Sequence, residues 1–150
     1  MKFRIAELSD IAQMQVVRHL VKENTLSDPN LVPDKDVAYY ITEKGKGWVA
    51  ETNGTIVGFS IVDLQDRSVW ALFVDPVHAE RGVGRALHRL MIDWYFSQTK
   101  ASIVLGTTQN TRAEKFYTLQ GWINIGSYSN GEIKFELSFE NWTGRKNGLS

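Results

Sequence analysis

Hydrophobic residues recur at two spacings along the 150-residue chain, and the switching between these spacings predicts a mixture of helices and strands. Apolar positions three or four residues apart indicate helices with one buried face, whereas apolar positions two apart indicate strands. Asn-Gly pairs at 53–54 and 130–131 lie between apolar runs and predict β-hairpins. The predicted strands are 2–7, 48–52, 55–64, 69–74, 101–105 and two that flank 130–131, and the predicted helices are 10–24, 33–45, 83–97 and 110–120.

These elements follow the order β-α-α-β-β-β-α-β-α-β-β, which predicts an α+β fold. The hairpins must be antiparallel, but 69–74, 83–97 and 101–105 form a βαβ unit whose two strands should be parallel. We therefore expect a central mixed, mostly antiparallel sheet of about seven strands flanked by four helices. Residues 1–140 should form a single domain, and the polar tail at 141–150 should fray.

The composition indicates a sizeable core and no overall charge. Hydrophobic residues make up 43% of the chain, and 17 Lys and Arg balance 17 Asp and Glu. Zero net charge argues against general nucleic-acid binding and against a polybasic membrane surface. The absence of cysteine excludes disulfides, thiolate metal sites and a cysteine nucleophile. The three histidines lack metal-ligand spacing, so we predict no bound metal.

The sequence also gives no sign of a membrane segment. No run reaches the roughly 18 apolar residues of a membrane span. The N-terminal residues carry charges in place of the apolar core of a signal peptide. We therefore expect a cytoplasmic protein that has neither a membrane nor a nucleic acid as a partner.

A buried strand that leads through a glycine-bearing turn into a helix is the first candidate site. The nearly all-apolar strand 69–74 precedes Glu80-Arg81-Gly82-Val83-Gly84-Arg85, which opens the helix at 83–97. The first turn of such a helix has unpaired N–H groups and the positive end of the helix dipole, both of which favour a phosphate. Arg81 and Arg85 add positive charge there. The same pattern also suits a plain strand-to-helix turn.

Two familiar phosphate motifs do not match this segment. A dinucleotide fingerprint requires a third glycine where Leu87 stands, and a P-loop requires Lys and then Ser or Thr where Arg85-Ala86 stands. Residues 78–89 nevertheless hold three Arg against one Glu, a local charge of +2 with His neutral. The net charge of zero for the whole chain therefore conceals a locally basic segment.

The predicted helix 110–120 carries the second candidate site. Asn110 stands just after a strand, where it can be an N-cap or a ligand-binding residue. Ala113 and Phe116 are placed on the buried face, and Tyr117 at its border can be a core aromatic or present its hydroxyl group to a ligand. Gly121 is predicted to stop the helix.

Together the two segments resemble the GNAT superfamily of CoA-dependent N-acetyltransferases. Strand–Asp-Pro–Arg-Gly-x-Gly–helix resembles that family's pyrophosphate-binding motif. Asn-x-x-Ala-x-x-Phe-Tyr-x-x-x-Gly-Trp resembles its C-terminal helix motif, which usually ends in Gly-Phe. Element order and length extend the resemblance to nearly the whole chain, and it implies a GNAT-like fold and an acyltransferase that uses acetyl-CoA as co-substrate.

The resemblance also implies roles for particular residues. The strand before the loop would pair with the pantetheine arm, and the loop amides would hold the pyrophosphate. Tyr117 would be the catalytic general acid that protonates the leaving thiolate, and a strand amide near Val74 would stabilise the oxyanion. The strands 69–74 and 101–105 would splay apart to admit the cofactor. The implied cofactor-binding residues are Leu72, Phe73, Val74, Glu80, Arg81, Gly82, Val83, Gly84, Arg85 and Asn110.

Some positions depart from the family pattern or stay ambiguous. Ala79 stands where Gln or Arg is frequent, and Glu80 brings a carboxylate close to the expected phosphates. Asp63 and Glu51 are candidates for the general base by strand position, although each reads more simply as a solvated strand residue. His88 and Arg89 are assigned to a solvated helix face. Tyr39, Tyr40 and Trp48 are candidates for lining an acceptor site or for core packing.

The leading interpretation is an N-acetyltransferase that moves acetyl from acetyl-CoA directly to an amine, on a small molecule or a protein, in a ternary complex. The alternative is a catalytically silent acyl-CoA-binding or regulatory module on the same fold. A third is a phosphate- or nucleotide-binding protein with a chance motif. Residues 25–32 and the two N-terminal helices should decide the acceptor, and a homodimer remains open because the alternating last strand can supply an edge or a face.

Overall fold

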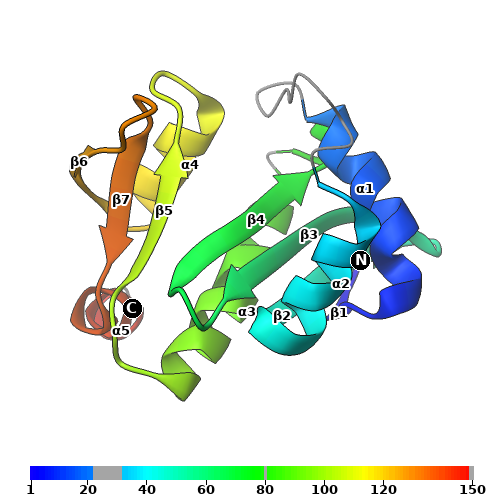
Figure 1. Cartoon of the computed structure of the whole chain (residues 1–150), viewed down its shortest axis with the longest axis horizontal. Coiled ribbons are helices and arrows are strands. Elements are labelled where there is room, and N and C mark those ends of the chain that lie inside the picture. The colour runs from blue at the N-terminus through cyan, green and yellow to red at the C-terminus, as the bar shows by residue number, and fades with distance from the viewer. Residues whose placement is uncertain (22–31, 80, 149–150) are drawn as a thin grey trace. The chain divides into compact units, whose positions relative to one another are not determined.

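The computed structural model describes residues 1–21, 32–79 and 81–148, and it divides into two compact units, residues 1–95 and 96–150 (Figure 1). Glu80 and residues 25–31 of the predicted acceptor loop lie outside the described residues. The strands are β1 (Lys2–Ile5), β2 (Gly45–Thr52), β3 (Thr55–Asp63), β4 (Ser68–Val74), β5 (Ile103–Thr107), β6 (Ile123–Ser127) and β7 (Ile133–Leu137). The helices are α1 (Ile11–Leu20), α2 (Asp34–Tyr39), α3 (Val83–Gln98), α4 (Arg112–Leu119) and α5 (Phe139–Gly148), with short turns η1 (Leu8–Asp10), η4 (Tyr40–Lys44) and η5 (Pro76–His78).

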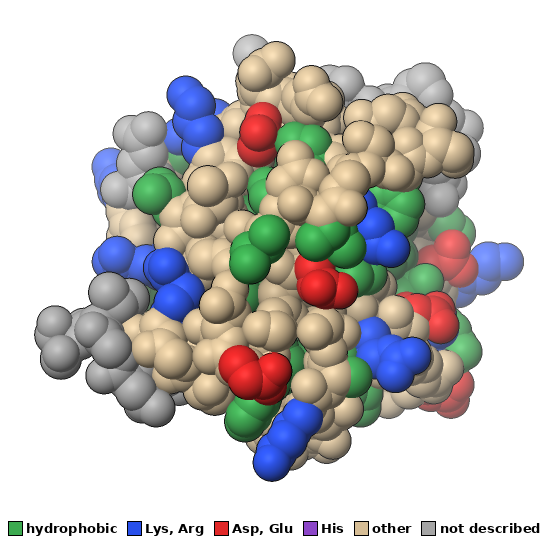
Figure 2. All heavy atoms as spheres, turned by 90° about the vertical axis from the view of Figure 1, so that its left-hand side faces the viewer, with side chains coloured by type: hydrophobic (Ala, Val, Ile, Leu, Met, Phe, Trp, Pro, Cys, Tyr) green, Lys and Arg blue, Asp and Glu red, His purple; other side chains and the backbone are tan. Residues whose placement is uncertain are grey.

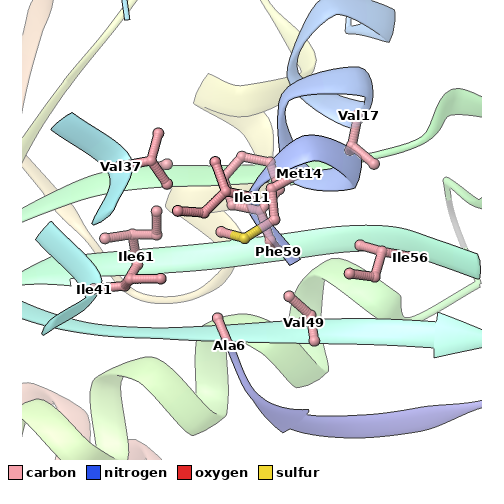
Figure 3. Packing of buried hydrophobic residues seen from close by; sticks show 11 residues of the cluster. Ala6, Ile11, Met14, Val17, Val37, Ile41, Val49, Ile56, Phe59 and Ile61 are labelled. Carbon is pink, nitrogen blue, oxygen red and sulfur yellow. The ribbon is translucent and has the colours of Figure 1, made fainter. Parts of the chain in front are cut away.

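The first unit is an antiparallel sheet in the order β1-β2-β3-β4 with helices on both faces (Figure 1). The predicted hairpin at Asn53-Gly54 joins β2 to β3, and both residues of its turn have positive φ. Figure 3 shows the core on the face covered by α1 and α2. Ile11, Met14 and Val17 project from α1 onto the sheet because they recur at helical spacing.

The opposite face of this sheet is covered by α3. Gly58 of β3 makes close packing possible, since a Cβ there would lie 3.1 Å from Leu87 Cδ1 and 3.3 Å from Val83 Cγ1. Trp48 of β2 packs edge-on against Trp94 of α3, with the ring centroids 5.8 Å apart. The start of α3 is therefore held against the middle of the sheet by side chains of its first two turns.

A β-bulge changes the direction of one side chain of β4. Ile61 lies opposite Ala71 and the next residue of β3, Val62, lies opposite Val69, so Trp70 is the extra residue. As a result Trp70 packs on the same core cluster as Ala71 and Phe73 instead of alternating to the α3 face. The bulge thus places two large aromatic side chains of one strand on the α1 side of the sheet.

The second unit is an antiparallel sheet in the order β5-β7-β6 with α4 and α5. Ile133, Phe135 and Leu137 of β7 alternate inward, as the sequence predicts. All five residues of β6 are exposed, including Ile123 and Ile125. Figure 2, seen from the side on which β6 is drawn in Figure 1, shows hydrophobic side chains scattered among charged ones rather than one continuous apolar patch.

The prediction of a fraying tail and of four helices is wrong, because residues 139–148 form a fifth helix, α5. Trp142 is buried, and Phe139 packs edge-on against Phe96 at 5.6 Å. Arg145 Nη2 donates to the carbonyl of Leu119 at 2.6 Å, so α5 satisfies an open carbonyl at the end of α4. The segment is polar in composition, but Phe139 and Trp142, three positions apart, anchor it as a helix. The boundary of a single domain at residue 140 stays a prediction.

Candidate active site

The turn from β4 to α3 has the local structure that the sequence predicts. Asp75 Oδ1 accepts a hydrogen bond from the Val77 amide at 3.0 Å, which fixes the chain reversal at η5. Gly82 has φ +81°, a left-handed conformation that favours glycine, and α3 begins at the next residue, Val83. The open amides of the first turn of α3 therefore follow directly on a glycine turn.

The electrostatics of this turn favour an anion. Arg81 and Arg85 are exposed, and neither forms an ion pair with any described residue. The first turn of α3 contains no acidic residue. Two cationic side chains and the positive end of a 16-residue helix thus meet at one place.

The three strand residues predicted to contact the cofactor lie on β4, which pairs only with β3 within the first unit. Leu72 and Val74 lie opposite Ser60 and Gly58, on the face that α3 covers. Phe73 lies on the other face, beside the α1 core cluster.

Asn110 lies in the second unit and is not the N-cap of the helix that follows. Thr111 is the cap, because its hydroxyl oxygen accepts from the Glu114 amide at 3.2 Å, and α4 begins at Arg112. Glu114 Oε1 in turn accepts from the Asn110 amide at 2.6 Å, which completes a capping-box-like arrangement. Asn110 is exposed with φ +61°, so its side chain is not used for capping.

Tyr117 is more deeply buried than the sequence predicts. It is the buried residue of α4, whereas Ala113 and Phe116 are half-buried, which reverses the predicted order. Its ring packs against Trp122 at 5.6 Å and Phe135 at 6.4 Å. Burial raises the pKa of Tyr117 well above that of a free tyrosine because the phenolate would be poorly solvated.

Gly121 ends α4 as predicted. Its φ is +98°, its amide donates to the Thr118 carbonyl, and the Trp122 amide donates to the Tyr117 carbonyl. These two hydrogen bonds form a Schellman motif. A Cβ at Gly121 would also lie 2.4 Å from Arg145 Cδ, so the glycine makes room for α5 as well.

The two residues considered for the general base are held in ion pairs. Asp63 is 2% exposed and binds Lys44 Nζ at 2.9 Å, and it also accepts from the Asp66 amide. Glu51 binds Arg4 Nε at 2.7 Å. Neither is the solvated strand residue that the sequence suggests, and both have a structural role instead.

Several other assignments change in three dimensions. His88 is fully buried on α3 and is not on a solvated face, whereas Arg89 is exposed as predicted. Trp48 belongs to the core beneath α3. Tyr40 stacks on Trp70 with ring centroids 3.9 Å apart, and Tyr39 is 44% exposed.

One charged residue was missed by the sequence analysis. Arg18 of α1 is only 5% exposed, and its guanidinium lies over the rings of Phe59, Trp70 and Phe73. Its position four residues after Met14 puts it on the apolar stripe of α1, and this was the signal that could have revealed it.

Comparison with known proteins identifies the family. The model of the acetyltransferase (GNAT) family matches residues 14–122, which include both the strand–loop–helix segment and the helix up to Trp122. The chain therefore belongs to the acetyltransferase (GNAT) family and is an acyltransferase, as the sequence predicts. No curated protein matches the chain.

Solved structures share the fold at low sequence identity. The ribosomal-protein-S18-alanine N-acetyltransferase of Escherichia coli is 20% identical with a TM-score of 0.72, and the match covers 92% of this chain and 93% of that one. The PaiA N-acetyltransferase of Thermoplasma acidophilum, solved in complex with coenzyme A, is 13% identical with a TM-score of 0.81, and the match covers 92% and 99%. A GNAT-family acetyltransferase of Staphylococcus aureus Mu50 is 19% identical with a TM-score of 0.74, and the match covers 92% and 99%.

These likenesses confirm the predicted α+β GNAT fold. None of the described helices combines the length and the apolar character that crossing a membrane requires.

Proposed function

We propose that this chain is an N-acetyltransferase that transfers acetyl from acetyl-CoA directly to an amine in a ternary complex. The observation that carries the proposal is the glycine turn and helix start after β4, with Arg81 and Arg85 exposed and unpaired to described residues, in a chain of the GNAT family. The PaiA structure contains coenzyme A, which supports a CoA thioester as the acyl donor.

The residues of this turn fit the phosphate groups of CoA. Gly82 leaves open space, since no atom lies within 4 Å of a Cβ built there. The amides of Val83 and Gly84 in the first turn of α3 can donate to phosphate oxygens, while Arg81 and Arg85 supply charge-assisted hydrogen bonds. We assign the backbone amides of Glu80 and of the rest of the loop to the pyrophosphate of CoA, as the family resemblance implies.

Acetyl-CoA supplies an activated thioester carbonyl. In the transfer the amine nitrogen forms a bond to the carbonyl carbon, the C–S bond breaks, one proton leaves the nitrogen and one proton is taken up by the sulfur. The backbone of Leu72, Phe73 and Val74 on β4 is assigned to the pantetheine arm and to the oxyanion, and Asn110 is assigned to hydrogen bonding with the same arm. Tyr117 is assigned as the donor of the proton to sulfur.

The raised pKa of Tyr117 has a consequence for its assigned role. Because a free thiol has a pKa of about 8.5, proton transfer from Tyr117 to a free thiolate is uphill, but Tyr117 is protonated at neutral pH and therefore has a proton to donate to the sulfur as the C–S bond breaks. Activity should therefore show no loss due to ionisation of Tyr117 below about pH 10.

The direct test is a thiol-release assay with acetyl-CoA over amines, amino acids, polyamines, aminoglycosides and N-terminal peptides. Release with at least one amine, and displacement of bound acetyl-CoA by CoA but not by ATP or NAD, is the expected result. Tight acetyl-CoA binding with no release over the whole panel would instead indicate the silent acyl-CoA-binding module. Displacement by ATP or NAD would indicate a nucleotide-binding protein.

Replacing both loop arginines tests the phosphate assignment. We expect Arg81→Ala with Arg85→Ala to weaken CoA binding by about tenfold at low salt, since each tenfold corresponds to about 1.4 kcal/mol. The difference should shrink as salt is raised, because exposed charges are screened. Calorimetry measures the change, and Lys35→Ala, an exposed cation of α2, is the control that should leave binding unchanged.

Tyr117→Phe tests the proton donor. We expect kcat to fall by about 100-fold, the lower end of general acid catalysis, with little change in affinity for acetyl-CoA. Steady-state kinetics with saturating acceptor measures both quantities. Tyr128→Phe, in the β6–β7 turn, is the matched control, and equal kcat in Tyr117→Phe and the wild type would contradict the assignment.

A further inference from the structure

Arg18 is a cation buried in the first unit. Its side chain is 5% exposed, and its Nε and Nη2 atoms have no hydrogen-bond partner within the described part of the chain. The described residues also provide no carboxylate within ion-pair distance of it. These two nitrogens lose hydration and gain no acceptor in exchange within the described residues.

Three aromatic rings form a box around the guanidinium. The Cζ atom lies 5.7 Å from the ring centroid of Phe59, 5.3 Å from that of Trp70 and 5.0 Å from that of Phe73. Such contacts stabilise a cation through the faces of the rings. They do not replace the hydrogen bonds that a guanidinium makes with its N–H groups in its own plane, so the box holds the charge but leaves Nε and Nη2 unused within the described residues.

The two unpartnered nitrogens define the kind of ligand. Nε and Nη2 share one edge of the guanidinium, and their N–H bonds run parallel, which is the arrangement that binds a planar carboxylate through two hydrogen bonds. Desolvation lowers the pKa of Arg18 to about 10, so the side chain remains a cation at neutral pH.

The single positive charge of Arg18 can neutralise a ligand with one negative charge but not a ligand with two. The nearest cation on the neighbouring turn η4, Lys44, is already engaged by Asp63 and Asp66. His19, the next residue of α1, is exposed. A carboxylate carries one negative charge, whereas a phosphate monoester carries close to two, and a single buried guanidinium cannot neutralise the second.

Two of the three aromatic residues of the box, Trp70 and Phe73, are partly exposed, and Trp70 is held in place by a neighbouring ring. Tyr40 stacks on Trp70 with an interplanar angle of 8°, and Lys44 Nζ lies 5.1 Å from the Tyr40 ring. The bulge in β4 brings Trp70 onto the same face as Phe73, and both are only half-buried. The outer parts of Trp70 and Phe73 thus reach the surface, whereas the Nε and Nη2 atoms of Arg18 are covered, so a ligand has to displace neighbouring side chains to reach them.

We propose that Arg18 binds the carboxylate of the acceptor, and that the acceptor is a free amino acid whose amino group is acetylated. This proposal rests on the proposed N-acetyltransferase function and names its acceptor class. Phe59, Trp70 and Phe73 exclude water from the carboxylate, and the Nε–Nη2 edge of Arg18 orients it. A peptide acetylated at its N-terminus would have its α-carboxylate in an amide bond and would not use this edge.

The test compares acid and amide forms of one acceptor. The twenty L-amino acids are screened by CoA release, and the best of them is compared with its α-carboxamide and with the corresponding decarboxylated amine. We expect the wild type to prefer the acid by at least about tenfold in kcat/KM, as for a charge-assisted pair of hydrogen bonds. The amino group of the carboxamide is less basic, so a larger fraction of it is unprotonated at neutral pH, and this difference works against the expected preference for the acid.

Variants of Arg18 identify the group responsible. Arg18→Met should lower kcat/KM for the acid by about 10- to 100-fold, mainly through KM, and leave the carboxamide within about twofold. Arg18→Lys keeps the charge but lacks the two-pronged edge, and it should lose most of the preference as well. Arg67→Lys, an exposed arginine in the β3–β4 turn, should behave like the wild type.

The possible results separate the two proposals. Equal kcat/KM for acid and carboxamide in the wild type, or equal losses on both in Arg18→Met, would overturn the role of Arg18 while leaving the acetyltransferase function intact. If no amine releases CoA, calorimetry with the twenty amino acids still decides the site. Binding that disappears in Arg18→Met supports it, and no binding to the wild type overturns it.

Discussion

Two buried charged residues of the first unit, Asp10 and Arg18, are treated in opposite ways by the fold. Asp10 is 5% exposed and accepts from Arg4 Nη1 and Nη2 at 2.8 and 2.9 Å, and from the Glu7 amide at 2.7 Å. Arg18 is equally buried, but its Nε and Nη2 atoms have no partner among the described residues. Burial alone therefore does not explain Arg18, because the same unit shows how a structural charge is satisfied.

The second buried carboxylate follows the pattern of Asp10. Asp63 is paired with Lys44 and accepts from a backbone amide of the turn that follows β3. Buried charges that serve only the fold are expected to be neutralised and hydrogen-bonded within the chain. The contrast with Arg18 is the physical reason for assigning Arg18 to a ligand.

The largest effect on stability is expected at Asp10. Asp10→Ala should lower the free energy of unfolding by about 2–3 kcal/mol at pH 7, less than the 3–5 kcal/mol for a wholly buried pair, because Glu51 still binds Arg4. Urea unfolding followed by circular dichroism measures the change. Glu43→Ala, an exposed carboxylate of η4, should change stability by less than about 0.5 kcal/mol.

The effect of Asp10 should also depend on pH. The hydrogen bonds from Arg4 lower the pKa of Asp10 below the value of 3.8 for a free aspartate. A lowered native pKa gives stability that is complete above the pKa of the unfolded chain and is lost as pH falls through the native pKa. The difference between wild type and Asp10→Ala should therefore shrink below about pH 4, and a difference that does not change with pH would contradict this ion pair.

A smaller effect of opposite sign is expected at Arg18. Burial lowers the pKa of Arg18 to about 10, a shift that corresponds to about 3 kcal/mol of lost hydration in the folded state. Cation–π contacts return about 2 kcal/mol, so Arg18→Met should raise the free energy of unfolding by about 1 kcal/mol. The cost of the buried cation is complete at neutral pH and declines only above about pH 10, where the native state releases its proton before the unfolded chain does.

Thermal and urea unfolding of Arg18→Met measure whether the free energy of unfolding rises or falls, and Arg67→Met is the control. A structural role for Arg18 requires destabilisation by the methionine, and that result would remove the contrast with Asp10. Stabilisation together with loss of the preference for the acid acceptor is the pattern of a residue kept for binding.

Local pattern predicted most of the elements and the position of the glycine turn between β4 and α3. The stripe that begins at Val83 predicted the start of α3, and the glycine at 121 predicted the end of α4. These features depend on residues a few positions apart, so the printed sequence contains them fully. The α5 helix was missed because it depends on contacts of Arg145 and Phe139 with residues far away in the chain.

The candidate site divides in the same way. The turn that contains Arg81, Gly82 and Arg85 was predicted from sequence because a turn and a helix start are local features, and the role of these residues in phosphate binding stays a prediction. Tyr117 was found by motif, but its deep burial was not, because Trp122 and Phe135 come together with it only in the folded unit. Whether an aromatic residue is at the border or in the centre of a core depends on its neighbours in space.

By itself, the sequence determined the order of helices and strands, the basic glycine turn and the membership of the GNAT family, since each of these follows from short-range spacing. Only the tertiary structure decided which charges are paired. Arg18 comes from α1 and its box from β3 and β4, and a bulge that no periodicity predicts puts Trp70 beside Phe73. Hydration and pairing are properties of the packed surroundings of a side chain, so the unpartnered nitrogens of the buried Arg18 could be recognised only in the folded structure.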